Sequence, residues 1–380
     1  MTHSEANYLV NLFLLTAKIV LPRSFTQSVP LLVYALFCIT CFPAGVTGQE
    51  LAASDETEAG TEAKGTVAGS PAGELAGELI LVVGAAGTEE FGEAFAEWGE
   101  RWKKVAEQSD LKFVSIGLGG KQAGGSDRDA LQRALTSEVD PSAKPLWLVL
   151  IGHGTYSRDV AKFNLRGPDI SGMDLANWID GHNRPVVIVN CASASGPFVN
   201  RLSGPKRVIV TATRSGIEQN YARFGDFLSE AIGSSESDLD HDGEVSIHEA
   251  FLRASAGVRM FYESGDRIAT EHALIDDNGD GKGTPATMFR GVRPSSRAKD
   301  GLALDGSAAL RVTVAPSGGR LPLTPDELKE RDEIETQIDA LRGNAGQLDR
   351  ETLDAALLPL MLRLSRIYQA VQQRANAGKD

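Results

Sequence analysis

The sequence predicts a three-layer α/β/α domain built on a mostly parallel β-sheet, with a helical hairpin after it. Short apolar runs, each as long as a strand buried on both faces, recur through the middle of the chain. Segments with helical periodicity alternate with these runs, and such alternation is typical of a parallel sheet covered by helices. The 380 residues, 42% hydrophobic and 23% charged, suffice for one such domain with smaller appendages.

The first 48 residues have the features of a targeting segment. Basic residues precede an apolar run over Val29–Phe42, which is too short to span a bilayer comfortably. Val46 and Gly48 are small enough for the −3 and −1 positions of a signal peptidase site, so we expect a secreted or periplasmic protein. The alternative is an uncleaved membrane anchor, because residues 8–21 are also apolar and the two runs can act together.

Residues 49–78 are expected to form a disordered linker. They contain seven acidic residues against one lysine, and small or polar residues fill most of the remainder. Over the whole chain the formal net charge is −13, which leaves no basic stripe for phosphate groups. Nucleic acids and anionic membrane surfaces are therefore not expected partners.

Cysteine usage singles out one thiol. Cys38 and Cys41 lie in the segment expected to be removed, so the mature chain keeps Cys191 alone. Exported proteins usually pair their cysteines, and an unpaired survivor therefore suggests a reactive thiol. The other interpretation is a buried, inert cysteine.

The main domain, expected over residues 79–290, contains strands and helices in alternation. Helices are expected where Phe91 begins an apolar face that reaches Val105, over Asp127–Leu135, and from about Phe224. The predicted strands are Leu79–Val83, Leu111–Ile116, Leu146–Ile151, Val186–Asn190 and Arg207–Thr211.

Beyond residue 290 the pattern weakens into a linker over 291–323 with one short strand at Ala309–Val314. Thr324 to Glu327 then match a capping box with proline at the first helical position, so a helix begins there. A second apolar stripe predicts a return helix, kinked at Pro359, and residues 324–376 should form an antiparallel hairpin. The sequence specifies no partner for this hairpin.

Two of the predicted strands end next to residues with catalytic potential. His153 and Gly154 follow the strand that ends at Ile151, and Cys191 follows the strand that ends at Asn190. Cysteine catalysis needs a thiolate, an imidazole that generates it, and two donors for the oxyanion. If the strands are neighbours, His153 faces Cys191, and the amides of Gly154 and Cys191 can point at a substrate carbonyl. A lone histidine after a strand is otherwise a structural residue.

Several motifs occur in an order that resembles the legumain-type cysteine peptidases of the caspase-haemoglobinase fold, over roughly residues 79–285. The resemblance implies hydrolysis or transpeptidation of a peptide or protein substrate, with His153 as the base and Cys191 as the nucleophile. The motifs are Leu146–Gly154, Asn190–Gly196, Thr211–Ser215, Gly225–Phe227 and Thr270–Asp276.

The resemblance also implies substrate-binding residues. Asp226 matches an aspartate of the family's S1 pocket, and Ser215 falls near a second pocket position. This chain departs from the family at Val189, where an acidic residue is usual, and at 85–90, which lack an Arg-His pair. We therefore do not expect asparagine specificity to carry over. An Asp226 without a basic partner could prefer Arg or Lys, and its alternative role is to cap a helix.

Residues 238–249 match every defining position of an EF-hand calcium loop. Glu244 offers its carbonyl, Ser246 a direct or water-bridged oxygen, Glu249 a bidentate carboxylate, and Gly243 the sharp turn. The alternative is a solvated acidic loop. The remaining carboxylates come from Asp238, Asp240 and Asp242.

A second segment repeats the start of such a loop with Asp276, Asn278, Asp280 and Gly281. Position twelve is Thr287, which cannot chelate bidentately, so a second Ca²⁺ would be held weakly or completed by other ligands. The histidines among these carboxylates lack zinc spacing and are expected at the surface. They are His241, His248 and His272.

Together these features favour a cysteine endopeptidase that binds calcium and is stabilised by it. The first alternative is an inactive calcium-binding scaffold or interaction protein on a peptidase fold, although both dyad residues are retained. The second is a serine hydrolase that uses Ser193 or Ser195 with His153, but the sequence contains no Gly-x-Ser-x-Gly elbow.

Overall fold

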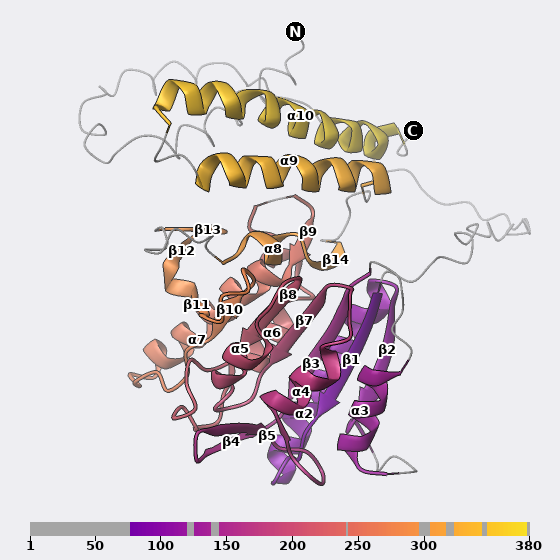
Figure 1. The fold of residues 1–380 in the computed structure, drawn as a ribbon, viewed down its shortest axis with the longest axis vertical. Coiled ribbons are helices and arrows are strands. Elements are labelled where there is room, and N and C mark those ends of the chain that lie inside the picture. Colours follow the sequence, from indigo (N-terminus) through magenta and orange to yellow (C-terminus); the bar gives the residue numbers. More distant parts are fainter. Residues whose placement is uncertain are drawn as a thin grey trace, which may run out of the picture. The chain divides into compact units, whose positions relative to one another are not determined.

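The structure is a computed structural model that describes residues 77–119, 125–137, 144–240, 242–295, 305–316, 323–343 and 348–377 (Figure 1). The expected signal peptide or anchor over 1–48 lies outside the described residues, as does almost all of the acidic linker. Within the described ranges, no helix combines the length and the hydrophobicity that crossing a bilayer requires.

A seven-stranded sheet forms the centre of the domain, in the order β11-β10-β8-β7-β3-β1-β2. The five predicted strands are confirmed and run parallel to one another. Four of them are apolar runs buried on both faces, whereas the edge strand Leu111–Ile116 is only partly buried. β10 (Leu274–Asp276) is antiparallel to β8 and pairs with β11 (Thr284–Pro285). The parallel strands are β1 (Gly77–Val83), β2 (Leu111–Ile116), β3 (Leu146–Ile151), β7 (Val186–Asn190) and β8 (Arg207–Thr211).

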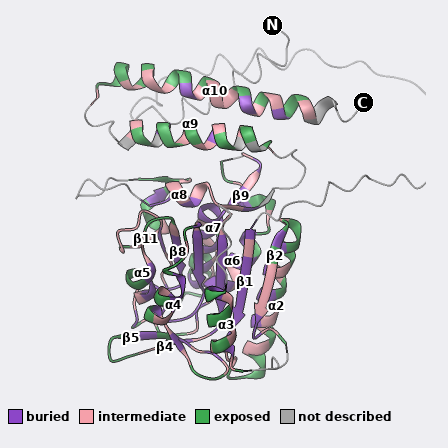
Figure 2. Cartoon of the chain, turned by 45° about the vertical axis from the view of Figure 1, so that its right-hand side comes forward, coloured by how far each residue is buried: buried purple, intermediate pink, exposed green. Residues whose placement is uncertain are grey.

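Helices cover both faces of this sheet, which confirms the three-layer α/β/α architecture (Figure 2). Successive strand residues face opposite layers: Leu79 and Leu81 belong to one apolar cluster, Ile80 and Val82 to the other. The first layer contains α2 (Glu89–Gln108), α6 (Phe224–Ala231) and α7 (Ile247–Ser264); the second contains α3 (Asp127–Thr136), α4 (Gly172–Ile179) and α5 (Pro197–Leu202).

A small antiparallel sheet follows β3 and was not predicted. Its first two strands are joined by Arg158 and Asp159, both with positive φ (52° and 61°). Hairpin turns of this kind usually carry glycine or asparagine, so the sequence lacks the ordinary hairpin signal. The strands are β4 (Gly154–Ser157), β5 (Val160–Phe163) and β6 (Ile170–Ser171).

The strand predicted over Ala309–Val314 is only partly correct. The segment begins with a short helix, α8 (Ser307–Leu310), and the strand β14 (Thr313–Pro316) follows it. Asp277 causes the difference, because its carboxylate accepts hydrogen bonds from the amides of Gly306 and Ala309 in the first turn of α8. β14 pairs with β9 (Glu244–Ser246), and the remaining short elements are η2 (Ser235–Ser237), η3 (Ala286–Met288), β12 (Phe289–Arg290) and β13 (Arg293–Pro294).

The C-terminal helical hairpin is present as α9 (Pro325–Gly343) and α10 (Arg350–Ala377). The predicted capping box forms, because the amide of Thr324 donates to Glu327 at 2.8 Å and the amide of Glu327 donates to Thr324 Oγ1 at 3.3 Å. α10 continues through Pro359. Residues Ile334, Ile338, Leu360 and Ile367 form the small core between the two helices.

Candidate functional site

His153 and Cys191 lie just beyond the carboxyl ends of two adjacent parallel strands. β3 pairs with β7 so that Leu150 is opposite Asn190. Cys191 is the next residue after β7, and His153 follows β3 by two positions. The predicted adjacency of the strands is therefore confirmed, and both residues belong to the sheet edge where ligands of such folds bind.

Within the described residues, no hydrogen bond joins His153 to Cys191. His153 Nε2 lies 3.0 Å from the carbonyl oxygen of Ala86, and the His153 ring packs edge-on against Phe91, with centroids 4.8 Å apart. Cys191 is 1% exposed. Burial raises the pKa of its thiol to about 12, and the charge of Glu271 adds to the effect. This arrangement is a closed site with a protonated thiol.

The N-terminal turn of α6 covers Cys191. A Cβ atom at Gly225 would lie 2.8 Å from the Cys191 Cβ atom and 2.8 Å from the Trp98 ring, so only glycine permits this approach. Glu271 holds the turn in place, because its carboxylate accepts hydrogen bonds from the amides of Arg223 (2.8 Å) and Phe224 (2.9 Å). The sequence placed Glu271 in a motif, but its partners are backbone amides and give no sequence signal.

The two amides expected to form the oxyanion hole are both engaged. Cys191 N–H donates to the Leu150 carbonyl at 2.9 Å as part of the sheet ladder, so the expectation that it points at a substrate is wrong for this structure. Gly154 N–H donates to Ser193 Oγ at 3.2 Å. A Cβ at Gly154 would lie 2.0 Å from the Ser193 carbonyl oxygen, which explains the glycine.

Neither candidate serine is hydrogen-bonded to the imidazole of His153. Ser193 Oγ donates to the Gly154 carbonyl at 3.2 Å. Ser195 is fully buried, and its hydroxyl bonds the amide and the hydroxyl of Thr213, each at 3.2 Å. A serine nucleophile requires a base within hydrogen-bond reach, so this geometry does not favour the serine-hydrolase alternative.

Asp226 has a basic partner, contrary to the expectation that it stands without one. Arg101 of α2 donates to Asp226 Oδ1 at 2.7 Å, and the two side chains are partly exposed. This pair occupies the carboxylate predicted to select the substrate side chain. Ser215 lies in the loop after β8, where its carbonyl accepts a hydrogen bond from the Thr213 hydroxyl at 3.3 Å. The sequence missed Arg101 because it lies on a helix far from Asp226 in the chain.

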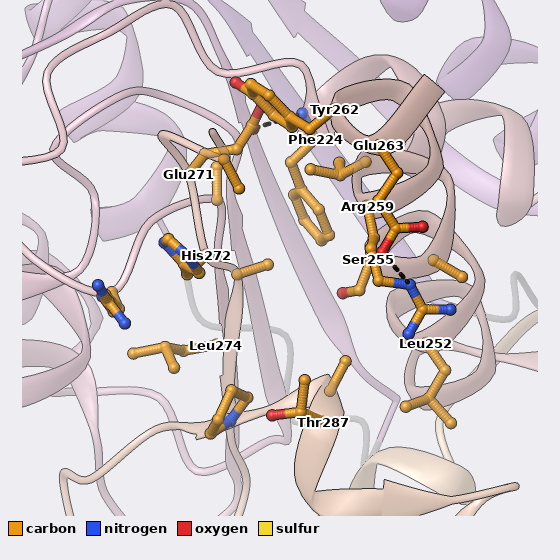
Figure 3. Close-up of a pocket in the computed structure, with 18 of the residues that line it drawn as sticks. Phe224, Leu252, Ser255, Arg259, Tyr262, Glu263, Glu271, His272, Leu274 and Thr287 are labelled. Atoms are coloured by element: carbon orange, nitrogen blue, oxygen red, sulfur yellow. Dashed lines mark hydrogen bonds and ion pairs between the residues drawn. The ribbon is translucent and has the colours of Figure 1, made fainter. Parts of the chain in front are cut away.

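A cavity of about 710 Å³ lies between α7 and the segment that leads into β10 (Figure 3). Ser255 and Arg259 of α7 lie on one side of it, and Glu271 and His272 lie on the other. His153 and Cys191 do not line it. Glu271 therefore connects two features, because it lines this cavity and holds the turn over Cys191.

The first predicted calcium loop brings its three aspartates together. Ligand oxygens of Asp238, Asp240 and Asp242 lie within 4.8 Å of one another, which fits an ion with ligand distances of about 2.3–2.6 Å. Gly243, with φ of 95°, makes the sharp turn, and its amide donates to Asp238 at 3.1 Å. The amide of Asp242 donates to Asp240 at 3.2 Å, and that of Glu244 donates to Asp242 at 2.8 Å.

Glu249 closes this loop from the first turn of α7. It is 2% exposed, and its Oε1 accepts hydrogen bonds from the amides of Leu239 (2.7 Å) and Asp240 (3.2 Å). Its Oε2 accepts from the Ser246 hydroxyl at 2.8 Å, as part of the capping box that begins α7. Burial raises the pKa of Glu249. A single carboxylate thus joins the loop to the helix that leaves it.

Arg331 of α9 lies beside the same loop. Its side chain is 4% exposed, and its Nη1 is 2.9 Å from Glu244 and 3.5 Å from Asp242. Burial raises the pKa of Asp242 to about 8 and the charge of Asp240 adds to this, whereas Arg331 opposes it. The guanidinium therefore balances part of the loop's negative charge.

Of the three histidines expected at the surface, His248 is buried, so that prediction is wrong. Its Nε2 lies 3.1 Å from the Val292 carbonyl and its ring packs on Phe289. Burial lowers the pKa of His248 to about 4. His272 is partly exposed and pairs with Glu218 at 2.6 Å, whereas His241 lies outside the described residues.

No protein-family model matches this sequence, and a search of curated proteins finds no match. Solved structures of caspases are similar to it. The Drosophila initiator caspase Dronc is 14% identical with a TM-score of 0.39, covering 64% of this chain and 96% of Dronc. Caspase-1 from Spodoptera frugiperda is 12% identical with a TM-score of 0.36, covering 53% of this chain and 86% of the caspase. These sequence identities and TM-scores are too low to assign the activity of the caspases to this chain.

Proposed function

We propose that this chain is a cysteine endopeptidase that cleaves peptide or protein substrates with His153 and Cys191 and binds calcium in the loop over 238–249. The observation that carries the proposal is the register of β3 and β7, which brings an imidazole and a thiol to one sheet edge. The N-terminal 48 residues further support a secreted or periplasmic protein.

In the proposed reaction, His153 accepts the Cys191 proton and the thiolate attacks the carbonyl carbon of the scissile peptide bond. Gly154 N–H donates to the oxyanion once the Ser193 hydroxyl has rotated away. His153 then gives the proton to the leaving amine, and water hydrolyses the acyl-enzyme. Because α6 covers the thiol in this structure, the turn around Gly225 must open first.

Calcium would act on this site through helix packing. Asp238, Asp240 and Asp242 would hold a Ca²⁺ ion, whose positive charge would offset their mutual repulsion. α7 starts at Ile247, within the last positions of the loop, and packs against α6. A Cβ at Gly257 of α7 would lie 2.5 Å from the Phe227 ring of α6. The metal site, α7 and α6 therefore form one packed series that ends at Cys191.

Within the proposed class of cysteine endopeptidases, the assignment to the legumain type rests on the order of the sequence motifs between residues 79 and 285. The Arg101–Asp226 ion pair weighs against a preference for Arg or Lys before the scissile bond, because it already occupies the carboxylate. A preference for another side chain requires a different pocket.

The second candidate function is an inactive calcium-binding scaffold. The specific observation in its favour is that Cys191 is covered and has a thiol pKa of about 12, with both expected oxyanion donors occupied. A scaffold needs no opening of the α6 turn. The two candidates therefore differ in whether this turn opens under native conditions.

A thiol-directed peptidyl electrophile separates the two. We expect labelling at Cys191, detected by mass spectrometry, that is lost in Cys191→Ser and slowed strongly in His153→Ala. A peptide library incubated with and without calcium then reports the preferred residue. If the electrophile labels Cys191 only after denaturation, and no peptide is cleaved, the scaffold function is correct.

A further inference from the structure

The cavity between α7 and the segment that leads into β10 has an apolar floor. Its volume of about 710 Å³ lies within the range of roughly 300–1,000 Å³ that is common for small-molecule sites. Neither His153 nor Cys191 lines it, so it is separate from the candidate catalytic edge. The floor consists of apolar side chains from α7, β10, β11 and β12, namely Leu252, Ala256, Leu274, Pro285 and Phe289.

Positively charged side chains surround this floor. Three guanidinium groups line the cavity, from Arg214, Arg259 and Arg267. Arg214 already has a partner, because its Nε is 3.1 Å from Glu218. The Arg259 side chain is 64% exposed and its Nε is 3.8 Å from Glu263, so this pair is weak. Within the described residues no carboxylate pairs with Arg267, whose guanidinium packs over an aromatic ring.

The carboxylates that line the cavity are already engaged. Glu263 faces Arg259 on the same helix. Glu271 is 3% exposed, and its carboxylate accepts hydrogen bonds from two amides of the α6 turn and from the Tyr262 hydroxyl. A cationic ligand would therefore find no free carboxylate here, whereas an anionic ligand would find guanidinium groups.

One hydroxyl in the cavity wall lacks a partner. Ser255 Oγ is buried, and within the part of the chain that the structure describes it makes no hydrogen bond. Figure 3 shows Ser255 on the cavity side of α7. Buried hydroxyl groups are normally satisfied, so an unpaired one in a cavity wall indicates where a polar group of a ligand would bind. Arg259 lies one helical turn further along α7, so both side chains can contact the same carboxylate.

Two residues of this cavity also form or hold the turn that covers Cys191. Phe224 belongs to that turn, and Glu271 accepts hydrogen bonds from its amides. A ligand in the cavity contacts both side chains in the positions that they have when Cys191 is covered. Binding therefore stabilises the covered arrangement, because a ligand shifts a protein toward the conformation that it binds.

We propose that the cavity is an effector site for a small apolar molecule that carries one carboxylate. The apolar part packs on the floor, and the carboxylate accepts hydrogen bonds from Ser255 and Arg259. The bound ligand keeps the α6 turn closed over Cys191. This inference goes beyond the peptidase activity and the calcium binding proposed above and depends on neither.

Calorimetric titration of the full chain with decanoate tests the site. We expect saturable binding of one decanoate per chain. 1-Decanol has the same chain without the charge and should bind about 10-fold more weakly, because it lacks charge-assisted hydrogen bonds. Decylamine should bind no more tightly than 1-decanol, since no carboxylate that lines the cavity is free. Equal affinity for decanoate and decylamine would overturn the proposal.

Substitutions on α7 locate the carboxylate. Arg259→Gln should weaken decanoate binding on the order of 10-fold and leave 1-decanol binding unchanged. Ser255→Ala should weaken decanoate binding about 3-fold, because one hydrogen bond is lost. Arg253→Gln is the matched control, since Arg253 is an exposed arginine of the same helix that does not line the cavity. Decanoate binding that responds equally to Arg253→Gln and Arg259→Gln contradicts the proposed site.

Hydrogen exchange measured by mass spectrometry tests the link to Cys191. At ten times its dissociation constant, decanoate should slow exchange in residues 222–228 about 10-fold. The same decanoate concentration should have much less effect in Arg259→Gln. Absence of saturable binding overturns the proposal, and so does saturable binding that leaves exchange in 222–228 unchanged. Neither measurement requires peptide cleavage, so a chain without peptidase activity can still confirm the effector site.

Discussion

The two turns with calcium-loop-like sequences, at 238–249 and from Asp276, share one local structure but have different surroundings. The turn at 238–249 runs from η2 through β9 into the first turn of α7, where its closing carboxylate lies. The turn that begins at Asp276 joins two short strands at the edge of the central sheet, where a carboxylate from another segment approaches it. The comparison shows that the turn itself is encoded locally, whereas its closure depends on which element the fold places beside it.

The neighbouring positive charges also differ. The first turn has the buried guanidinium of Arg331 at 3.5 Å from Asp242. The second has Lys282, which is mostly exposed and whose ammonium is 3.9 Å from Asp280. A buried cation beside the ligands competes with a metal ion more strongly than a solvated one. Calcium affinity at the two turns should therefore respond differently to loss of these side chains.

The largest expected effect is that of removing calcium. Each site occupied at about 1,000 times its dissociation constant stabilises the folded state by about 4 kcal/mol. Chelation should therefore lower the melting temperature by roughly 10 °C or more. Differential scanning calorimetry in calcium and in EGTA measures this shift. With Asp280→Asn the shift should be about half as large, and an unchanged shift would mean that only the first turn binds an ion.

Alanine at the two turn glycines should have a smaller effect. Gly243 and Gly281 both have positive φ, so a side chain there costs about 1–2 kcal/mol of backbone strain. We expect similar losses of unfolding free energy in Gly243→Ala and Gly281→Ala, measured by urea denaturation in EGTA. Gly181→Ala is the control, because that position has open space and no positive φ. If only one of the two variants lost unfolding free energy, the two turns would not share one geometry.

The smallest expected effect concerns the neighbouring cations. Arg331→Gln should raise calcium affinity at the first turn about 3- to 10-fold, because a competing charge near its ligands is removed. Lys282→Gln should change affinity at the second turn by less than about 2-fold, since exposed charges are screened. Titrations in the Asp280→Asn and Glu249→Gln backgrounds report each turn separately. Equal responses would show that burial of Arg331 does not matter.

The parallel part of the fold could be predicted because its inner strands are almost continuous apolar runs buried on both faces. The hairpin of β4 and β5 could not, since Arg158 and Asp159 do not resemble hairpin-turn residues. The strand expected at Ala309 was partly wrong because a distant carboxylate, Asp277, caps a helix there. Local patterns fail where a partner from elsewhere in the chain changes the preferred conformation.

The sequence also predicted the sheet edge that carries His153 and Cys191, since parallel strands place their carboxyl ends together. It did not predict that this site is closed. Closure depends on the approach of Gly225 to Cys191 and on Glu271, which holds that turn through backbone amides. Backbone amides occur at almost every residue, so this partnership has no sequence signature.

The sequence by itself determined the turn at 238–249, because all its proposed ligands fall within twelve consecutive residues and its shape is set by hydrogen bonds between near neighbours. Only the tertiary structure decided how the second turn is closed. Asp305 approaches it because β10 and β11 hold the turn at the sheet edge and α8 is capped against Asp277. A short-range motif can specify a turn, but a carboxylate from a distant segment reaches it only after packing has fixed both segments in space.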